Sequence, residues 1–423
     1  MNTLFTNARI LTSLGEIISG CLGVADDTIA FVGDLPKDFS AQRIIDCRGD
    51  LLMPGLVNTH THMAMTLFRN SADDMELTAW LRDRIWPLED KLTAEDTYWG
   101  TMLATAECIR GGCTCINDMY FFMDQTAKAI ADSGIRAVLG QGIVSGNDDG
   151  NSRLSIAKTL FDNYNNAENG RIKIAIPPHA EYTCNEATLL ASSELAGKLD
   201  APLHIHLSET FQEHEECKLR HQLTPAAYLK SLGMLREKTL LAHCVHIDED
   251  DVALISASKA HVLHCPQSNL KLGSGIAPIP TMLASRINVS LGTDGAASNN
   301  NLDMFEELRL VATIHKGITT NASVITAKQA LSMATANGAF ALGFNTGRLA
   351  PGALADIIRI NTKVPNMIPI NDLRSAAVYS ACAADVKMTM VNGRILYENG
   401  EFFFLDMERI SSEVERIVER YGI

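Results

Sequence analysis

The stretch LLMPGLVNTHTHMAM, residues 51–65, places two histidines at the end of an apolar run. The run reaches a Pro-Gly pair, resumes for two apolar residues, and then presents His60 and His62 with one residue between them. Side chains two residues apart on a strand point to the same side. Two imidazoles on one side of a strand end predict a metal site, because neutral ring nitrogens bind borderline metal ions well.

Seven further apolar runs follow, and each of the eight is succeeded by a helix-like segment. The eight runs are LLMPGLVNTH, CTCINDM, RAVLGQGI, KIAIPPHA, PLHIHLSE, TLLAHCVH, HVLHCPQS and NVSLGTDG. Eight strand–helix alternations over about 300 residues predict an α/β fold, a parallel (β/α)8 TIM-type barrel rather than an open doubly wound sheet. A Rossmann-type dinucleotide site is excluded separately, since no G-x-G-x-x-G follows a strand.

The two ends of the chain share a different, β-rich pattern. Short β-type runs such as TLFTNARILTS fill the first 50 residues, and similar runs return in GALADIIRIN and VKMTMVNGRILYENGEFF. We therefore predict a small β-sandwich domain built from residues 1–53 and 350–423, with the barrel, residues 54–349, inserted between its halves. The last stretch, DMERISSEVERIVERYG, has apolar residues at helical spacing and predicts a surface helix.

Composition and charge narrow the function classes. Hydrophobic residues make up 46% and charged residues 20%, which is typical of a globular protein. The net charge of −14 repels phosphates, so we expect neither nucleic acid nor an anionic membrane as a partner. No secretory signal, membrane-length apolar stretch or C-x-x-C is visible, and the ten cysteines are scattered. We expect a cytoplasmic protein with free thiols.

Polar side chains gather at the C-terminal ends of the apolar runs, where barrels of this kind carry their chemistry. These residues are His60, His62, His179, His206, Glu209, His243, His264 and Asp294. Histidines that end strands by chance and are satisfied by the core would explain one or two of them, but not the whole set.

The fifth and eighth runs complete a candidate ligand set. His204 and His206 share one side of the fifth run; we assign His206, nearer the mouth, as a ligand and His204 as a packed supporting residue. The eighth run ends in GTDG, where Asp294 can add an oxygen ligand. Three histidines and one aspartate leave room on a single Zn²⁺ for a water molecule, whose pKa can fall to about 7. Fe²⁺ or Mn²⁺ could use the same donors.

PGLVNTHTH, HIHLSE, AHCVH, HCPQSNLKLGSG and GTDGAASNN, in that order, resemble the amidohydrolase superfamily over nearly the whole chain. The segment HMAMTLFRNSADDMELTAWLRDRIWPLEDKLTAEDTYWG looks like that of the 5′-methylthioadenosine/S-adenosylhomocysteine deaminases. The resemblance implies zinc-dependent hydrolytic deamination of an adenosine-type nucleoside to its inosine analogue. The candidate substrates are 5′-methylthioadenosine, S-adenosylhomocysteine and adenosine.

The resemblance also implies roles for individual residues. The family's metal ligands match His60, His62, His206 and Asp294. Glu209 would pass a proton to N1 of the purine while hydroxide attacks C6, and His243 would orient that hydroxide. Asp294 would take the proton of the hydroxide and pass it to the departing ammonia. An exchange of roles between His243 and His246 remains open at this point.

Three positions match the family's substrate contacts, and a fourth, Trp80, is a further candidate. Glu89 matches a ribose-binding glutamate, His179 a sugar contact, and Arg153 an arginine suited to the carboxylate of a homocysteine moiety. Trp80 could pack against the adenine or the thio-substituent, or could belong to the core or a lid. Without the resemblance, Glu89 could be a helix-surface charge and Arg153 a solvated loop cation. Gln141 stands where some members carry a second basic residue, which favours smaller substrates such as methylthioadenosine or adenosine.

Other function classes share part of the pattern found in the adenosine-type deaminases. Guanine deaminases and triazine chlorohydrolases share the H-x-H, the H-x-x-E and the final aspartate, and would differ in the pocket at Glu89 and Arg153. A non-catalytic binding protein could keep the barrel, but would need neither Glu209 nor His243, since neither is required to hold a metal. Zinc deaminases of the cytidine type are excluded because no P-C-x-x-C is present. Association into a homo-oligomer is compatible with the sequence.

Overall fold

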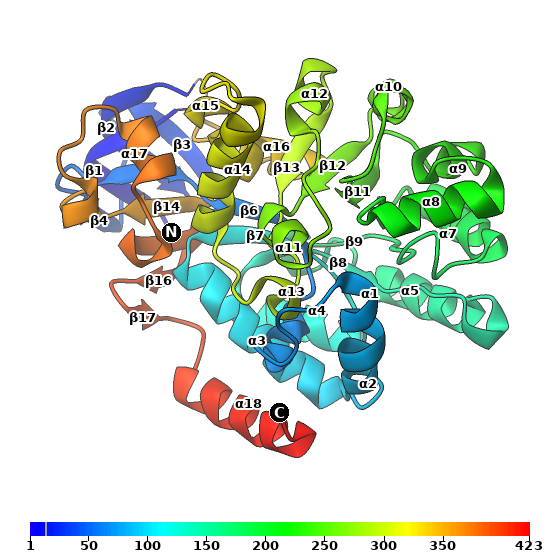
Figure 1. The fold of residues 1–423 in the computed structure, drawn as a ribbon. Coiled ribbons are helices and arrows are strands. Elements are labelled where there is room, and N and C mark those ends of the chain that lie inside the picture. The colour runs from blue at the N-terminus through cyan, green and yellow to red at the C-terminus, as the bar shows by residue number, and fades with distance from the viewer. Residues whose placement is uncertain (13–14) are drawn as a thin grey trace.

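Eight parallel strands form the centre of the molecule in the computed structural model, which describes residues 1–12 and 15–423 (Figure 1). They are β6 (Leu56–Thr61), β7 (Cys113–Tyr120), β8 (Arg136–Gln141), β9 (Ile172–Ile174), β10 (Leu203–Leu207), β11 (Thr239–His243), β12 (His261–His264) and β13 (Asn288–Leu291). Each predicted apolar run therefore contains one barrel strand. The strands pair in chain order within two groups, β6 to β9 and β10 to β13. The predicted (β/α)8 barrel is confirmed.

Two junctions close these groups into a ring. Between β9 and β10, Ile176 pairs with Leu203 in a parallel bridge. Between β13 and β6, the backbone N–H of Asp294 donates to the carbonyl of His60 at 2.9 Å. Gly292 permits this approach, because a Cβ there would lie 2.7 Å from the backbone nitrogen of His60. Closure brings the C-terminal ends of all the barrel strands to one rim.

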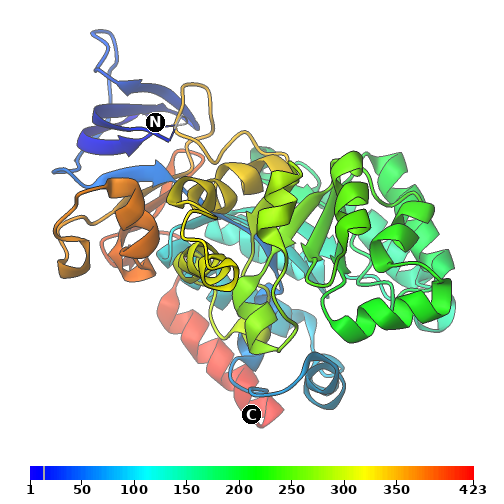
Figure 2. The same cartoon turned by 45° about the horizontal axis from the view of Figure 1, so that its top comes forward.

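Helices cover the outside of the barrel (Figure 1, Figure 2). They include α3 (Ala94–Arg110), α4 (Met123–Ser133), α5 (Asn151–Tyr164), α7 (Glu186–Leu199), α8 (Phe211–His221), α9 (Pro225–Ser231), α10 (Glu249–Ser258), α12 (Ile279–Ala284), α14 (Met304–Thr319), α15 (Ala327–Ala334) and α16 (Ala336–Ala341). Short ones near the rim include η1 (Met63–Phe68), α1 (Leu77–Trp80), η2 (Leu81–Ile85), α2 (Trp86–Glu89), η3 (Gly146–Asp148), α11 (Pro266–Lys271) and α13 (Ala296–Asn299). Capping boxes at Thr93 and Asp248 fix where α3 and α10 begin.

Both ends of the chain build one separate sheet, which is the form that the predicted β-sandwich takes (Figure 1). Its described strands are β1 (Thr3–Leu11), β2 (Ile17–Ala25), β3 (Thr28–Gly33), β4 (Arg43–Asp46), β5 (Leu51–Pro54), β14 (Ile357–Ile360), β15 (Val386–Val391), β16 (Arg394–Glu398) and β17 (Glu401–Phe402). The order is β17-β16-β15-β14-β5-β1-β2-β3, with β4 also paired to β1. Strands from opposite ends of the chain are therefore neighbours. Residue 13, which ends the predicted first run, lies outside the described residues.

Two of the predicted strands differ in extent from the strands in the structure. The run 51–60 is divided, because β5 pairs with β14 in the end sheet while β6 enters the barrel. Gly55 lies between them, and a Cβ there would come within 2.1 Å of the Thr114 side chain, so glycine lets the chain pass from one sheet to the other. The fourth run is a strand only to Ile174, since two prolines follow that cannot donate to a ladder.

The last helix, α18 (Met407–Tyr421), packs on α3 of the barrel, although the predicted domain boundary groups it with the end sheet (Figure 1, Figure 2). The hydroxyl of Tyr421 donates to Asp96 Oδ2 at 3.0 Å, and Arg420 pairs with the same carboxylate. A further short helix, α17 (Leu373–Tyr379), contacts α14 and α15. Two helices from the C-terminal part of the chain, α17 and α18, therefore pack against helices of the barrel.

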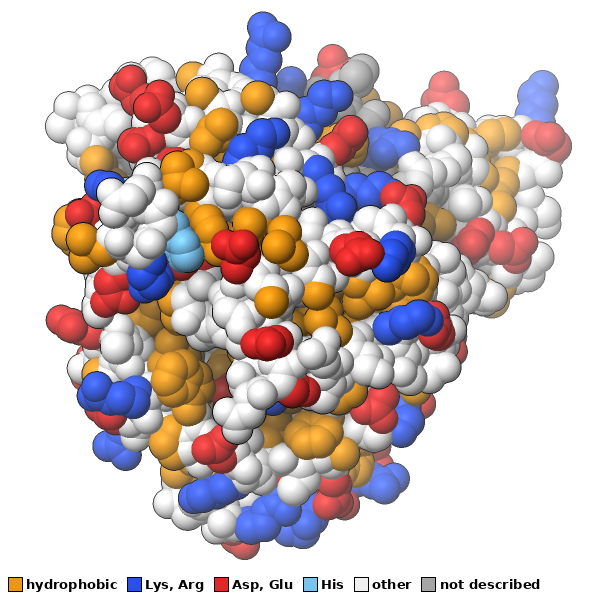
Figure 3. All heavy atoms as spheres, turned by 90° about the vertical axis from the view of Figure 1, so that its right-hand side faces the viewer, with side chains coloured by type: hydrophobic (Ala, Val, Ile, Leu, Met, Phe, Trp, Pro, Cys, Tyr) orange, Lys and Arg blue, Asp and Glu red, His pale blue; other side chains and the backbone are white. Residues whose placement is uncertain are grey.

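The surface carries charges of both signs. On the face shown in Figure 3, acidic and basic side chains are mixed, with hydrophobic groups between them. A phosphate backbone approaching this face would meet repulsion as well as attraction. None of the described helices combines the length and the apolar character needed to cross a bilayer.

A buried ion pair joins the barrel to the end sheet. Arg136 begins β8, Asp356 precedes β14, and both side chains are almost completely buried. Nε and Nη2 of Arg136 donate to the two oxygens of Asp356 at 2.8 and 2.9 Å, and the N–H of Asn392 donates to the same carboxylate at 2.9 Å. This two-point contact fixes the two parts of the molecule relative to each other.

Removal of one partner would leave the other charge buried and unpaired. We expect Arg136→Met to lower the free energy of unfolding by about 3–5 kcal/mol, measured by urea denaturation. Lys158→Ala, which removes an exposed pair with Asp162, is the control, with an expected change below about 1 kcal/mol. A loss in R136M no larger than in the control would contradict the role given to the buried pair.

Candidate active site

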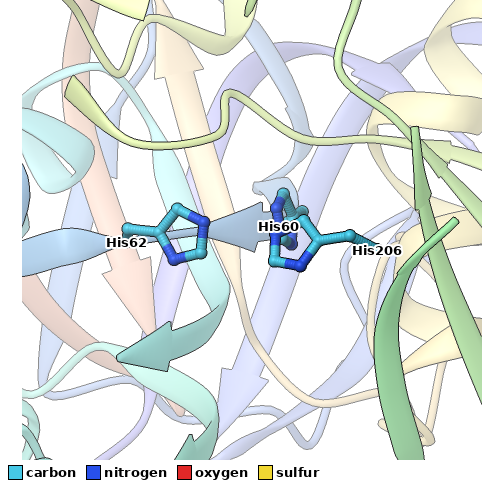
Figure 4. Close-up of side chains that lie close together, drawn as sticks. All are labelled: His60, His62 and His206. Carbon is cyan, nitrogen blue, oxygen red and sulfur yellow. The ribbon is translucent and has the colours of Figure 1, made fainter. Parts of the chain in front are cut away.

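Three histidines from two strands meet at the rim of the barrel (Figure 4). His60 lies in β6, His62 directly follows that strand, and His206 lies in β10. One ring nitrogen of each lies within 4.8 Å of the corresponding nitrogens of the other two. The fold thus brings together histidines from residues 51–65 and from the fifth apolar run, which are far apart in the sequence.

Asp294, which follows β13, completes the group. Its Oδ1 lies 3.4 Å from His60 Nε2 and 3.2 Å from His62 Nε2. Both His60 Nε2 and Asp294 Oδ1 are buried, and neither has a hydrogen-bond partner in the described part of the chain. Buried polar atoms without partners are costly unless something else binds them. Three imidazole nitrogens and one carboxylate oxygen form a donor set that fits a divalent metal ion.

The other ring nitrogen of each histidine, Nδ1, contacts a group on a neighbouring part of the barrel. Nδ1 of His62 donates to a main-chain carbonyl of β7, and Nδ1 of His206 donates to the carbonyl of His179 at 2.7 Å. These bonds fix the tautomer with hydrogen on Nδ1, so Nε2 is available to a metal ion. Nδ1 of His60 lies 2.8 Å from Nε2 of His204, which stands beside the ligand as expected of a supporting residue.

The pKa values of the group favour metal binding and proton donation at different residues. Burial acts to raise the pKa of Asp294, but the neighbouring His60 and His62 imidazoles hold it well below its usual range. Burial keeps the pKa of His206 well below its usual value. Burial also raises the pKa of Glu209. His206 and Asp294 are therefore held in the deprotonated forms that bind metals. His62 differs, because burial acts to lower its pKa but the neighbouring Asp294 raises it to about 9, so a metal ion must displace a proton there. Glu209 retains a proton more readily than an exposed glutamate.

Glu209 and His243 lie together beside this cluster. Glu209 Oε2 is 3.7 Å from His243 Nε2, and the Ser274 hydroxyl donates to Glu209 Oε1 at 3.2 Å. Nδ1 of His243 contacts Asn269 Oδ1 at 2.8 Å. A ring nitrogen of His243 also lies within 4.8 Å of two of the candidate ligand atoms. The pair is therefore close enough to the candidate ligands to act on a molecule bound there.

His246 lies outside this group. Its Nε2 donates to the carbonyl of Ser274 at 2.7 Å, and its ring lies 5.9 Å from that of Phe211. The structure thus brings His243, rather than His246, to the cluster. His243 and Asp294 have φ values of 71° and 62°, in the left-handed region that non-glycine residues rarely adopt. Such strain is typical of functional positions.

Glu213, which the sequence analysis did not single out, holds the backbone at Glu209. Its two carboxyl oxygens accept hydrogen bonds from the N–H of Ser208 at 2.8 Å and of Glu209 at 2.7 Å. Burial raises the pKa of Glu213 to about 7. Thr210 caps α8 and Glu213 is three residues later, so the T-x-x-E pattern was a visible signal for this contact.

A cavity of about 930 Å³ opens at the cluster, within the usual range for a small-molecule site. Its walls bring together all the predicted substrate-binding residues, which are Trp80, Glu89, Arg153, His179, Glu209 and Asp294. Gln141 also lines the cavity.

A widened helical turn places Trp80 and Glu89 in the same cavity wall. They are nine residues apart, which in a regular α-helix puts side chains on opposite sides. Between them, η2 is a π turn in which the N–H of Trp86 donates to the carbonyl of Leu81. Pro87 follows; it has no N–H and its ring crowds the carbonyl four residues back, which explains the wider turn. Trp80 is buried and packs in the core as well as lining the cavity.

The other predicted contacts are set into the walls rather than exposed. Burial raises the pKa of Glu89 to about 7, and the neighbouring Tyr120 hydroxyl acts in the opposite direction. The Arg153 guanidinium lies 4.6 Å from the centre of the Phe121 ring. Gln141 is buried, and its Oε1 accepts from a main-chain N–H of α4 at 3.5 Å. Glu89 is therefore no helix-surface charge, and Arg153 is no freely solvated cation.

His264 ends its strand as predicted but does not line the cavity. Its ring lies 5.8 Å from that of His315 in α14. The preceding residue, Leu263, packs with interior residues of the barrel such as Val57 and Cys115. Successive side chains of a strand alternate, so His264 points to the surrounding helices.

The family model described as "Amidohydrolase family" matches residues 51–396, and the chain belongs to this family. A 5-methylthioadenosine/S-adenosylhomocysteine deaminase of Dictyoglomus turgidum is 46% identical over 98% of both chains. A 5′-deoxyadenosine deaminase of Methanosphaera stadtmanae is 44% identical over 91% of both chains. The crystal structure of an adenosine deaminase from Xanthomonas campestris with bound zinc is 32% identical, with a TM-score of 0.94, covering 99% of this chain and 98% of that one. The predicted class, a metal-dependent aminohydrolase, is confirmed.

The donor set predicts metal content directly. We expect about one divalent ion per chain in the purified protein, measured by inductively coupled plasma mass spectrometry. His206→Ala removes one donor and should weaken metal affinity at least about 100-fold in chelator competition. His246→Gln, outside the cluster, is the matched control and should keep its ion. Full affinity in H206A would show that His206 is no ligand.

Proposed function

We propose that this chain hydrolyses the 6-amino group of an adenosine-type nucleoside, releasing ammonia and leaving the inosine analogue. The observation that best supports this activity is the Glu209–His243 pair, which lies beside a cluster of three histidines and one aspartate at the cavity. The deaminase names of the relatives supply the nucleoside class. We take zinc as the ion, in keeping with the zinc bound by the Xanthomonas enzyme. Its proposed ligands are His60, His62, His206 and Asp294.

Each proton transfer has a residue suited to it. Zinc bound at the cluster would lower the pKa of a water molecule to about 7, which supplies a nucleophile at neutral pH. The first proton of that water passes to Glu209, and Asp294 accepts the second, the hydroxyl proton, through Oδ1, which has no hydrogen-bond partner among the described residues. Glu209, whose pKa burial raises, donates its proton to N1 of the purine as C6 is attacked. His243 orients the water through Nε2. Asp294 then returns its proton to the amino group, which leaves as ammonia.

The cavity walls suggest how the nucleoside is held. Glu89, in its ionised form, can accept hydrogen bonds from both ribose hydroxyls, and His179, which lines the same cavity, can contact the sugar. Trp80 offers an aromatic surface to the purine or to the 5′-substituent. We assign these three residues to substrate binding.

The charge of the walls favours small or apolar 5′-substituents. Among the described residues that line the cavity, Arg153 is the only lysine or arginine, and Gln141 is neutral. Three further lining residues, Trp86, Phe122 and Ile156, are apolar and more than 40% exposed, as expected at the mouth. A homocysteine carboxylate would meet one cation there, whereas a methylthio group would meet apolar side chains. We therefore propose methylthioadenosine, 5′-deoxyadenosine or adenosine ahead of S-adenosylhomocysteine.

Ammonia release by the zinc-loaded enzyme tests this proposal. The panel comprises 5′-methylthioadenosine, 5′-deoxyadenosine, adenosine, S-adenosylhomocysteine, guanine and a chlorotriazine. We expect kcat/KM for methylthioadenosine to exceed that for S-adenosylhomocysteine by about tenfold or more. Turnover of guanine or the triazine alone would replace the substrate assignment. No turnover at full metal content would favour a binding protein.

A conservative substitution separates the proton donor from the metal ligands. Glu209→Gln should keep about one metal ion and lose activity by about 10²–10⁴-fold, because glutamine can still accept from Ser274 but carries no acidic proton. Glu215→Gln, on the exposed side of the same region, removes only a pair with Lys218 and is the control. Loss of the metal in E209Q would show that the division between ligand and proton donor is wrong.

A further inference from the structure

One short segment contacts the two side chains assigned to proton transfer and the histidine assigned to orient the water. Residues 268–274 begin within α11 and continue into the turn that follows it. Separate side chains of this segment reach Asp294, His243 and Glu209. None of them belongs to the proposed ligand set, and the mechanism above gives none of them a role.

Ser268 acts on Asp294. Its hydroxyl donates to Asp294 Oδ2 at 2.7 Å, and the Ser298 hydroxyl donates to the same oxygen at 2.7 Å. With Oδ2 occupied by two hydroxyls, the carboxylate presents only Oδ1 to the cluster. Ser268, together with Ser298, thus determines which oxygen of Asp294 faces the metal donors.

Asn269 acts on His243. A carbonyl oxygen only accepts, so the 2.8 Å contact with Asn269 Oδ1 requires hydrogen on Nδ1 of the imidazole. Nε2 then carries the lone pair and faces Glu209. The Nδ2 atom of Asn269 has no partner among the residues described, so only its oxygen is in use. The tautomer of His243 is set by this one bond.

Ser274 acts on Glu209. Its hydroxyl donates to Glu209 Oε1 at 3.2 Å, while its carbonyl accepts from His246 Nε2 at 2.7 Å. Gly273 and Gly275 flank it with φ values of 68° and 123°, which side-chain-bearing residues rarely adopt. These two glycines let the chain turn back so that Ser274 reaches the glutamate.

The segment is tied to the scaffold away from the site. The N–H of Gln267, just before it, donates to the buried Glu307 of α14 at 3.2 Å. Lys271 Nζ contacts Asp73 Oδ1 at 2.7 Å and the carbonyl of Ala297 at 3.2 Å. A residue can orient another only if its own position is fixed, and these contacts fix it.

We propose that residues 268–274 are one positioning element that sets the geometry of Asp294, His243 and Glu209 for proton transfer. The choice of reaction rests on the function proposed above, whereas the element itself rests on the hydrogen bonds. Asn269 and Ser274 contact proton-handling groups that are not ligands. Their loss should therefore lower kcat and leave KM and metal content nearly unchanged.

Asn269→Ala and Asn269→Asp are the decisive pair. Alanine removes the acceptor; aspartate keeps an oxygen at the same place and gives up only an amide nitrogen that has no described partner. With methylthioadenosine, we expect N269A to lower kcat about 10²-fold, with KM within about threefold of wild type and one metal ion retained. N269D should stay within about tenfold of the wild-type kcat.

A spectroscopic readout needs no substrate. In the zinc-loaded protein labelled with ¹⁵N-histidine, the His243 resonances are those missing from His243→Gln. Wild type and N269D should show His243 as the Nδ1–H tautomer, and N269A should lose that fixed tautomer. Gln267→Ala is the matched control, because no described hydrogen bond involves its side chain; kcat, KM and the His243 signal should be unchanged.

Three results would overturn the positioning element: equal losses of kcat in N269A and N269D, a loss that follows metal content, or an unchanged His243 tautomer in N269A. Failure of the wild-type enzyme on every adenosine-type substrate would instead overturn the proposed function. In that case the tautomer comparison would still decide whether Asn269 positions His243.

Discussion

The seam between the first and last barrel strands is the constraint on which the site depends. His60 and His62 stand on one side of it and Asp294 on the other, so the cluster exists only when the barrel is closed. The backbone bond from Asp294 to His60 makes that closure, and Asn58 reinforces it: its amide nitrogen donates to the Thr293 hydroxyl at 2.7 Å, and its amide oxygen accepts from the Thr293 N–H at 2.9 Å. Folding of the barrel and assembly of the donor set are therefore one event.

Buried carboxyl groups around the site divide into two kinds. Against the effect of burial, two imidazoles keep the pKa of Asp294 low, and this carboxylate stays ionised. Burial raises the pKa of Glu213 to about 7 and of Glu307 to about 8, and both groups accept hydrogen bonds from main-chain N–H groups. Negative charge is thereby concentrated at Asp294, while the side chains of Glu213 and Glu307 hold the backbone of neighbouring segments.

The sequence predicted the barrel because apolar runs and strand ends are local features. Polar residues at those ends were sufficient to find the cluster, and the family resemblance supplied the roles. Three kinds of feature could not be predicted from the sequence. The side to which His264 points depends on the register of one short strand. The π turn before Pro87 is a local distortion with no periodic signature. The contacts of Ser268, Asn269 and Ser274 depend on how a loop folds back in three dimensions.

The end sheet has a consequence for synthesis on the ribosome. β5 lies between β1, which is made before it, and β14, which is made about 300 residues later. Until the later strand emerges, one edge of β5 has free N–H and carbonyl groups, and the guanidinium of Arg136 has no carboxylate. A nascent or truncated chain therefore exposes an open strand edge next to an uncompensated cation, a surface that invites aggregation or capture by a chaperone.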